Sequence, residues 1–344
     1  GMGLGTLFSG PLSDAYGRKA LVLWPFAAFI AGSLLCAIAP TFELLLAGRF
    51  IQGIAVAGPR IAGMAMVRDL YSGTKMASIM SLAMIIFGLV PAVAPLIGQA
   101  INNAFGWHSI FIAMAALGVV LSIWFGLRQP ESHPVEARRP MRIGTLWDAT
   151  KMAFSNRVFR YSVAVLTCLY GALFTQISLI QPIFETYYDK AESFPLWFGA
   201  IALLTMSSSV INAKIVGRLG MRKIIQSVLI VQIILASTVT LVQLTTGTLP
   251  FWMFFIWATS VMFVVGFTFG NLNALSMEPM GKIAGLAASI SGSICTVLAA
   301  FISIGVSLVF DGTPLALTIG VLACATSGFI LMRLLGPRRA TDES

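Results

Sequence analysis

Residues 10–19 read Gly-Pro-Leu-Ser-Asp-Ala-Tyr-Gly-Arg-Lys and separate two strongly apolar stretches of the chain. A related run, Ala-Lys-Ile-Val-Gly-Arg-Leu-Gly-Met-Arg-Lys, occupies residues 213–223 and again separates two apolar stretches. Gly17 aligns with Gly220, and Lys19 aligns with Arg222. Any tight turn favours glycine and arginine. However, if one helix is missing before residue 1, each run follows the second apolar stretch of its half of the chain. This shared position indicates an internal repeat.

The composition of the chain outside these turns indicates a membrane protein. Of 344 residues, 58% are hydrophobic and 10% are charged, whereas soluble domains carry about 25% charged residues. Apolar runs close to the length of a bilayer crossing recur along the sequence. This composition argues against a water-soluble enzyme, and we expect an integral membrane protein built from α-helices.

The apolar runs define the predicted membrane helices. We predict full spans at 20–39, 43–67, 76–101, 108–127, 158–183, 195–213, 224–245, 251–276, 284–309 and 314–335. A shorter helix is predicted at 1–11, ending in a polar turn at Ser13–Asp14. Eleven residues cannot cross a core that needs about 20, so we expect the first helix and part of the second to be missing.

With one helix restored, the prediction is two six-helix bundles. The predicted parts are an incomplete N-terminal bundle at 1–127, a cytoplasmic linker at 128–157, a C-terminal bundle at 158–336 and a cytoplasmic tail at 337–344. A short surface helix is expected in the linker, around residues 146–154. Parallel repeats of this kind are typical of transporters.

The net charge of +9 is distributed unevenly. Basic residues fill alternate gaps between the apolar runs, and Lys190 is the only one in the other gaps. This asymmetry marks the cytoplasmic side, so we expect a multi-pass membrane protein with a cytoplasmic C-terminus. The same distribution leaves no basic patch for nucleic acid.

The residues that support enzymatic chemistry are sparse. The four cysteines lie inside apolar segments without paired spacing. His108 and His133 are the only histidines, and they lie in loops or at interfaces. We therefore predict no metal site, no cofactor and no enzymatic activity.

Three motifs make the chain resemble the major facilitator superfamily. Gly10, Asp14, Gly17, Arg18 and Lys19 match its motif after the second helix, although Ala15 replaces the usual arginine. The second motif is Arg49-Phe-Ile-Gln52-Gly53, similar to Arg-x-x-Gln-Gly. The third is similar to the Gly/Pro motif of drug:proton antiporters and comprises Gly88, Pro91, Pro95 and Gly98. Leu46–Gly53, Val67-Arg68-Asp69 and Asn273-Ala-Leu-x-x-x-Pro279 together resemble Bcr/CflA-type bacterial drug-resistance exporters.

This resemblance implies a transporter that exports small lipophilic or cationic compounds, with the proton gradient as its energy source and a monomer as its expected state. It also implies a charge network that holds the outward-open state, formed by Asp14, Gly17, Arg18, Arg68 and Asp69. Alternating access needs a latch that breaks and re-forms, and charge pairs can provide one. The alternative is that these charges only set the topology and cap helices.

Two arginines lie within the predicted helix at 43–67. Arg49 and Arg60 are eleven positions apart, so they share one helix face at a separation of about 16 Å. A guanidinium inside the membrane is costly, and it normally faces the bundle interior with a partner. We predict a role in substrate binding or proton coupling for Arg49, Gln52, Gly53 and Arg60. For the two arginines, structural pairing or snorkelling to the surface remain the alternatives. Gly53 in this helix, and Gly1, Gly3 and Gly5 in the first helix, are small enough to allow a neighbouring helix to pack closely.

A third set of candidates lines helices that face the central cavity in the resembled fold. Tyr170, Phe174, Ile177 and Gln181 share one face of the helix at 158–183, and Phe263, Phe267 and Asn271 follow at four-residue spacing. We expect Tyr170, Phe174, Gln181 and Asn271 to contribute to this cavity, with helix packing or lipid contact as the alternative. The Gly/Pro motif is expected to bend its helix, to pack closely and to prevent leakage.

Two other functions fit the sequence. The same fold could carry a sugar, metabolite or amino acid, although a sugar site would need more Asn, Gln and Trp. A membrane enzyme or receptor is a further alternative, but no catalytic cluster is evident. The predicted exporter lacks an acid deep within a span: Glu43, Glu185 and Glu278 lie near span ends. Since the family often places this acid in the first helix, we expect it upstream.

Overall fold

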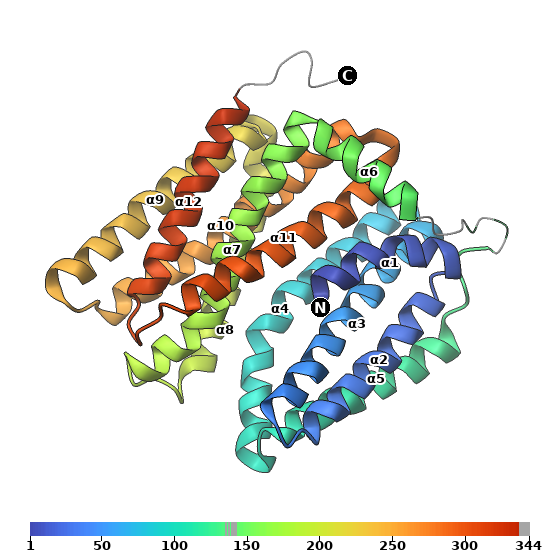
Figure 1. Cartoon of the computed structure of the whole chain (residues 1–344), viewed down its shortest axis with the longest axis horizontal. Coiled ribbons are helices and arrows are strands. Elements are labelled where there is room, and N and C mark those ends of the chain that lie inside the picture. The colour runs from blue at the N-terminus through green and yellow to red at the C-terminus, as the bar shows by residue number, and fades with distance from the viewer. Residues whose placement is uncertain (135, 137, 139–142, 337–344) are drawn as a thin grey trace. The chain divides into compact units, whose positions relative to one another are not determined.

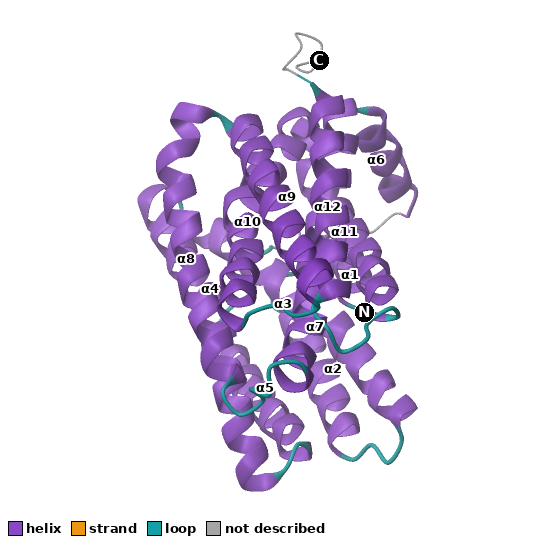
Figure 2. Cartoon of the chain, turned by 90° about the vertical axis from the view of Figure 1, so that its left-hand side faces the viewer, coloured by secondary structure: helices purple, strands orange, loops and turns teal. Residues whose placement is uncertain are grey.

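The computed structural model describes residues 1–134, 136, 138 and 143–336, and helices dominate these residues (Figures 1 and 2). The helices are α1 (Met2–Tyr16), α2 (Ala20–Ala37), α3 (Phe42–Leu70), α4 (Gly73–Phe105), α5 (His108–Arg128), α6 (Ile143–Ser155), α7 (Arg157–Thr186), α8 (Phe194–Leu219), α9 (Met221–Thr246), α10 (Phe251–Met277), α11 (Ala284–Ser307) and α12 (Leu315–Leu335). A 3-10 turn at Glu278–Ile283 joins α10 to α11. The prediction of an all-α membrane protein is confirmed.

Every predicted span corresponds to a helix. Within the described residues, nine helices are long and apolar enough to cross a membrane, and α4 adds a shorter apolar stretch at Leu89–Phe105. Several helices continue beyond their predicted ends, because hydropathy marks the apolar core of a helix and not its polar last turn. Thus α8 continues to Leu219, six residues past its predicted end, through the basic residues Lys214 and Arg218.

The predicted turn at Ser13–Asp14 is wrong. Both residues belong to α1, which continues to Tyr16 and ends at Gly17. Gly17 has φ 97°, a conformation that ends a helix and that glycine adopts without a steric penalty. The repeated run at 213–223 behaves in the same way, since α8 ends at Gly220 with φ 79°.

The chain divides into two compact units, which are described separately. The first comprises Gly1–Val90, Ala94–Thr150 and Gly285–Ile294, and the second comprises Pro91–Val93, Lys151–Ala284 and the chain from Cys295. The predicted linker at 128–157 contains α6, and the division falls within this helix. The rest of the linker is described only in part, and the predicted tail at 337–344 lies outside the described residues.

In the first unit, α3 packs against α1 on one side and against α2 on another, and α2 also packs against α5. Small residues allow these close contacts. A Cβ built on Gly32 would lie 2.9 Å from the carbonyl oxygen of Gly48, and one on Gly5 would collide with the carbonyl of Ile54. The predicted packing role of the N-terminal glycines is confirmed at Gly5.

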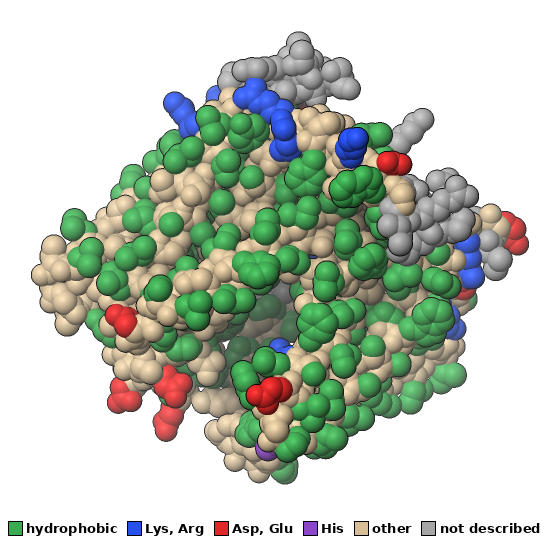
Figure 3. Space-filling view, viewed as in Figure 1, with side chains coloured by type: hydrophobic (Ala, Val, Ile, Leu, Met, Phe, Trp, Pro, Cys, Tyr) green, Lys and Arg blue, Asp and Glu red, His purple; other side chains and the backbone are tan. Residues whose placement is uncertain are grey.

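The second unit has the larger apolar core. Helices α7, α9, α10 and α12 pack together around it, and Phe184, Phe254 and Trp257 are almost completely buried there. Aromatic rings continue this core towards the loop before α8, where Phe194 packs edge-on against Phe184. In this unit, basic side chains gather at the end where α12 terminates and acidic ones at the opposite end (Figure 3).

Candidate functional site

A charge network is centred on Arg18, in the turn between α1 and α2. Its Nη1 donates to Asp14 Oδ1 at 2.6 Å and to Ser13 Oγ at 2.8 Å, and its Nε donates to Asp69 Oδ2 at 3.2 Å. The Arg18 side chain is 12% exposed, against 52% for Asp14 and 28% for Asp69. One guanidinium therefore ties the last turn of α1 to the last turn of α3.

The other two residues predicted for this network have different positions. Gly17 provides the turn itself. Arg68 is exposed in the last turn of α3 and forms no ion pair among the described residues. At this position its positive charge interacts favourably with the negative end of the helix dipole. This arrangement corresponds to the alternative in which these charges cap helices.

Sequence reasoning missed Glu131. Its carboxylate accepts the backbone N–H groups of Arg18 at 3.0 Å and of Lys19 at 3.2 Å. The next residue, Ser132, donates its hydroxyl to Asp69 Oδ2 at 3.3 Å. No spacing rule connects residues so distant in the chain, so the sequence carried no signal for this contact.

A hydrogen-bonded relay positions Arg49 within the first unit. Arg49 Nη1 donates to Gln52 Oε1 at 2.9 Å, and Gln52 Nε2 donates to Ser33 Oγ of α2 at 2.6 Å. Gln52 is 3% exposed and Ser33 is fully buried, whereas Arg49 is exposed and lies 6.0 Å from the ring centroid of Phe111. The exposed guanidinium of Arg49 is thus held by two buried, uncharged side chains, Gln52 and Ser33. Ser33 was not predicted.

Arg60 and Gly53 lie further along the same helix. Arg60 is exposed on α3, and the structure shows no ion pair for it among the described residues. The space beside Gly53 is occupied by α1, because a Cβ there would lie 3.1 Å from the backbone nitrogen of Met2. This arrangement corresponds to the neighbouring-helix alternative for Gly53.

The α7 candidates form one partly exposed face in the second unit. The rings of Tyr170 and Phe174 are 6.0 Å apart and meet edge-on, and Gln181 is exposed further along α7. Phe269 of α10 packs on Tyr170 with centroids 4.5 Å apart. Tyr170 and Phe174 therefore lie together on this face of α7.

Asn271 lies in a buried contact between α10 and α8. Its Nδ2 donates to Asn212 Oδ1 at 2.9 Å and to the carbonyl of Phe267 at 2.8 Å. Asn212 Nδ2 lies 3.5 Å from Asn271 Oδ1. Asn271 is 5% exposed, so in this structure its amide bonds to another helix.

Helix packing or lipid contact was the favoured interpretation for Phe263 and Phe267. Both phenylalanines line a groove of about 420 Å³ between α9 and α10. Phe269 faces α7, and residues two apart on a helix point in nearly opposite directions. The four-residue spacing identified a common face but not the helix that it faces.

The Gly/Pro motif lies on α4. The helix continues through Pro91 and Pro95 as far as Phe105, and Pro91 is exposed. The expected close packing is absent at Gly98, where a Cβ would meet nothing within 4 Å. The surroundings of Gly88 lie outside what the structure describes.

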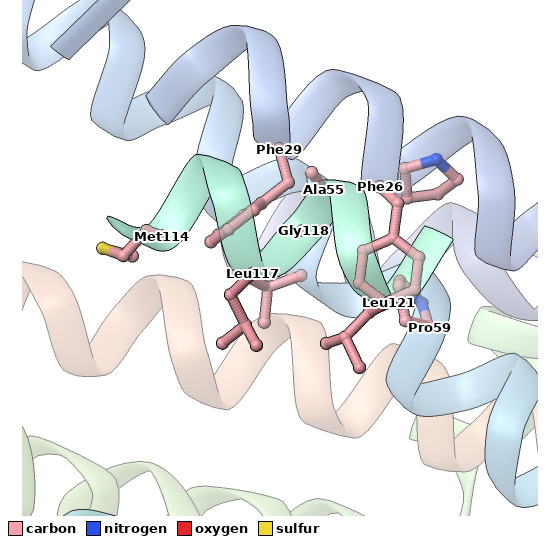
Figure 4. A pocket seen from close by; sticks show the side chains of 10 residues that line it. Phe26, Phe29, Ala55, Pro59, Met114, Leu117, Gly118 and Leu121 are labelled. Carbon is pink, nitrogen blue, oxygen red and sulfur yellow. The ribbon is translucent and has the colours of Figure 1, made fainter. Parts of the chain in front are cut away.

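An apolar pocket of about 300 Å³ lies in the first unit between α2, α3 and α5 (Figure 4). Phe26 and Phe29 line it from α2, and Leu117 and Leu121 line it from α5. No group of three or more metal-ligating side chains occurs among the described residues. The contacts described at these sites are ion pairs, hydrogen bonds and apolar contacts.

Comparison with known proteins decides the family. The model of the Major Facilitator Superfamily matches residues 1–304. The chain belongs to this superfamily. It is 27% identical over 350 residues to the multidrug resistance protein MdtL of Salmonella heidelberg, covering 100% of this chain and 85% of that protein. It is also 27% identical over 329 residues to a bicyclomycin resistance protein homologue of Haemophilus influenzae, covering 93% and 81%.

A solved structure of the superfamily confirms the fold. The D-xylose–proton symporter superposes with a TM-score of 0.71 at 14% identity, covering 97% of this chain and 84% of the symporter. At this identity the likeness concerns the fold alone. The family and the fold predicted from the sequence motifs are thus confirmed, and the chain is a multi-pass membrane protein of the facilitator superfamily.

Proposed function

We propose that this facilitator is a secondary active transporter that exports small drug-like molecules across the bacterial inner membrane in exchange for protons. The observation that carries this proposal is its similarity, along essentially its whole length, to proteins named for multidrug and bicyclomycin resistance.

The network around Arg18 supports alternating access as the mechanism. Its ion pairs join the ends of two helices at distances of 2.6 and 3.2 Å. They lie at a partly exposed position, where such pairs contribute about 0–1 kcal/mol each. Interactions of this strength can break and re-form during each transport cycle, so the network can stabilise one state without trapping the protein.

The residues along the membrane helices support a substrate with a large apolar surface. The faces and pockets described above are lined mainly by aromatic and aliphatic side chains, and their polar groups are few. Apolar pockets with a small number of polar groups suit drug-sized ligands. A lipophilic compound, with or without a positive charge, is the proposed substrate class.

The position of the coupling acid is a separate part of this proposal. Among the described helices that could span a membrane, acidic side chains occur only near the ends: Glu43 is in the first turn of α3, and Glu278 follows the last residue of α10. Arg49, held by Gln52, is the proposed partner for a proton-binding group or for substrate. A cytoplasmic C-terminus and a monomeric state complete the proposal.

Drug susceptibility provides the test. A bacterial strain without its main efflux pumps would express the protein or its Arg49→Ala variant, at matched membrane levels. We expect the protein to raise the inhibitory concentration of several lipophilic drugs, to lower the cellular level of a fluorescent drug, and to lose this effect when an uncoupler is added. Uptake of a sugar or amino acid, without drug resistance, would contradict the proposal.

A further inference from the structure

Glu131 lies three residues beyond the end of α5 and binds the start of α2. Its Oε1 accepts the N–H of Arg18 at 3.0 Å, and its Oε2 accepts the N–H of Lys19 at 3.2 Å. Arg18 and Lys19 directly precede the first residue of α2, and their N–H groups have no acceptor within that helix. The helix dipole also favours a negative charge there. Both oxygens of Glu131 are therefore used to hold one short backbone segment.

Gly17 makes room for this carboxylate. A side-chain Cβ at position 17 would collide with Glu131 Oε2. The equivalent Gly220 has a similar positive φ, but a Cβ there would meet nothing within 4 Å. The repeated turn thus needs glycine for its conformation in both halves, and only the first turn needs it for the approach of a carboxylate.

Other groups hold the same segment on the network. Ser132 Oγ donates to Asp69 Oδ2 at 3.3 Å, so Asp69 receives both Arg18 and Ser132. Lys19 Nζ donates to the carbonyl of Gly126, near the end of α5, at 2.7 Å. The α1–α2 turn is therefore bonded both to the last turn of α5 and to the chain that follows it.

We propose that Glu131 is a positioning residue of the latch. By holding the backbone of Arg18 and Lys19, it sets the turn so that the Arg18 guanidinium reaches Asp14 and Asp69 together. The chain leaving α5 then docks and releases with the latch, which couples the linker to alternating access. The predicted effect on transport rests on the proposed function, but the contact between Glu131 and the turn can be tested without substrate.

The electrostatic environment keeps this carboxyl charged. Partial burial acts to raise the pKa of Glu131, but backbone N–H groups of His133, Arg18, Lys19 and Ser132 together outweigh it and hold the pKa below its ordinary value of 4.5. Arg138 Nη2 lies 3.9 Å from Oε2 and adds a positive charge. The contact is therefore present at neutral pH.

Hydrogen–deuterium exchange of the purified protein in lipid nanodiscs tests the contact directly. Removing both acceptors in Glu131→Ala should speed exchange at the amides of Arg18 and Lys19 about tenfold. Glu131→Gln keeps one acceptor oxygen and should give an intermediate rate. Glu136→Gln removes a carboxylate from the same segment and should leave these amides unchanged. Unchanged exchange in Glu131→Ala, or the same effect in Glu136→Gln, would overturn the proposal.

Transport then separates positioning from simple stabilisation. Per folded molecule, Glu131→Ala should lower turnover about tenfold with little change in apparent KM, and Glu131→Gln should restore part of it. Adding Glu131→Ala to Asp69→Asn should cause little further loss of turnover, because both changes disable the same latch. Unchanged turnover per folded molecule would show a merely structural role and overturn the inference. If no drug is transported, the proposed function fails, whereas the exchange rates still decide whether Glu131 holds the turn.

Discussion

Gly17 and Gly220 end equivalent helices with the same backbone conformation, at φ 97° and 79°. Basic residues follow each of them, but a carboxylate approaches only Gly17. The two turns of the repeat have therefore the same geometry and different surroundings. The first is built into a network of charges, whereas the space where a side chain would begin at Gly220 is open.

This difference predicts unequal effects of alanine at the two glycines. Gly220→Ala introduces backbone strain alone, which costs about 1–3 kcal/mol. Gly17→Ala introduces the same strain and also displaces Glu131, so it should lower stability further and slow transport. Thermal unfolding and drug efflux of the two variants measure this difference. Equal losses in both would show that the carboxylate contact contributes nothing.

The two acids that bind Arg18 should contribute unequally. Asp14 is 52% exposed and pairs within four residues, whereas Asp69 is 28% exposed and joins Arg18 to another helix. We expect Asp14→Asn to slow turnover about twofold and Asp69→Asn about tenfold. Efflux rates at matched protein levels check the order. Arg68→Gln is the control, since Arg68 is exposed and outside the network, and a loss as large as that of Asp69→Asn would contradict this assignment.

The relay beneath Arg49 predicts that Ser33 affects transport without touching substrate. Ser33→Ala leaves the buried Gln52 Nε2 without its partner, at a cost of about 1–3 kcal/mol. We expect lower turnover, because Gln52 then orients Arg49 less well. Ser122→Ala is a matched control: both hydroxyls bond to the carbonyl four residues earlier, at 2.7 and 2.6 Å, but Ser122 has no bond to Gln52. Equal transport in the two variants would remove the relay from the mechanism.

The pair of amides that joins Asn271 to Asn212 predicts a non-additive effect on stability. Asn271→Leu leaves Asn212 without its cross-helix partner and should cost about 1–3 kcal/mol. Adding Asn212→Leu removes the unpaired group and should recover part of this loss. Unfolding of both single variants and of the double variant measures the coupling free energy. Additive losses would show that the two amides act independently.

The lowered pKa of Glu131 predicts how its contribution varies with pH. A carboxyl whose pKa is depressed on folding stabilises the protein above its unfolded pKa, and the stabilisation is lost as pH falls through the folded pKa. The difference in melting temperature between the protein and Glu131→Gln should therefore be constant from pH 8 to about pH 5.5 and should shrink below pH 4.5. A change centred near pH 6.5, the usual range of histidine, would contradict the assignment to Glu131.

The sequence was sufficient for the helices because a bilayer requires long apolar runs. It was also sufficient for Arg18, Asp14 and Asp69, because these residues lie in two short runs that resemble motifs of a known family. The ends of the helices were predicted less accurately, because α1 and α8 continue through polar residues beyond the apolar runs. Glu131 was missed because its contact joins residues 113 positions apart, which no local pattern records. The neighbours of Phe263 and Phe267 were missed for a different reason: periodicity defines a face but not what packs against it.

Drug movement in everted membrane vesicles tests the central proposal most directly. Acidifying the vesicle interior relative to the medium reproduces the gradient that drives an exporter, with its cytoplasmic face outwards. We predict that vesicles containing the protein accumulate a lipophilic drug above its external concentration, and that they release it when the gradient is collapsed. Drug levels that only equilibrate, unaffected by the gradient, would contradict proton-driven export.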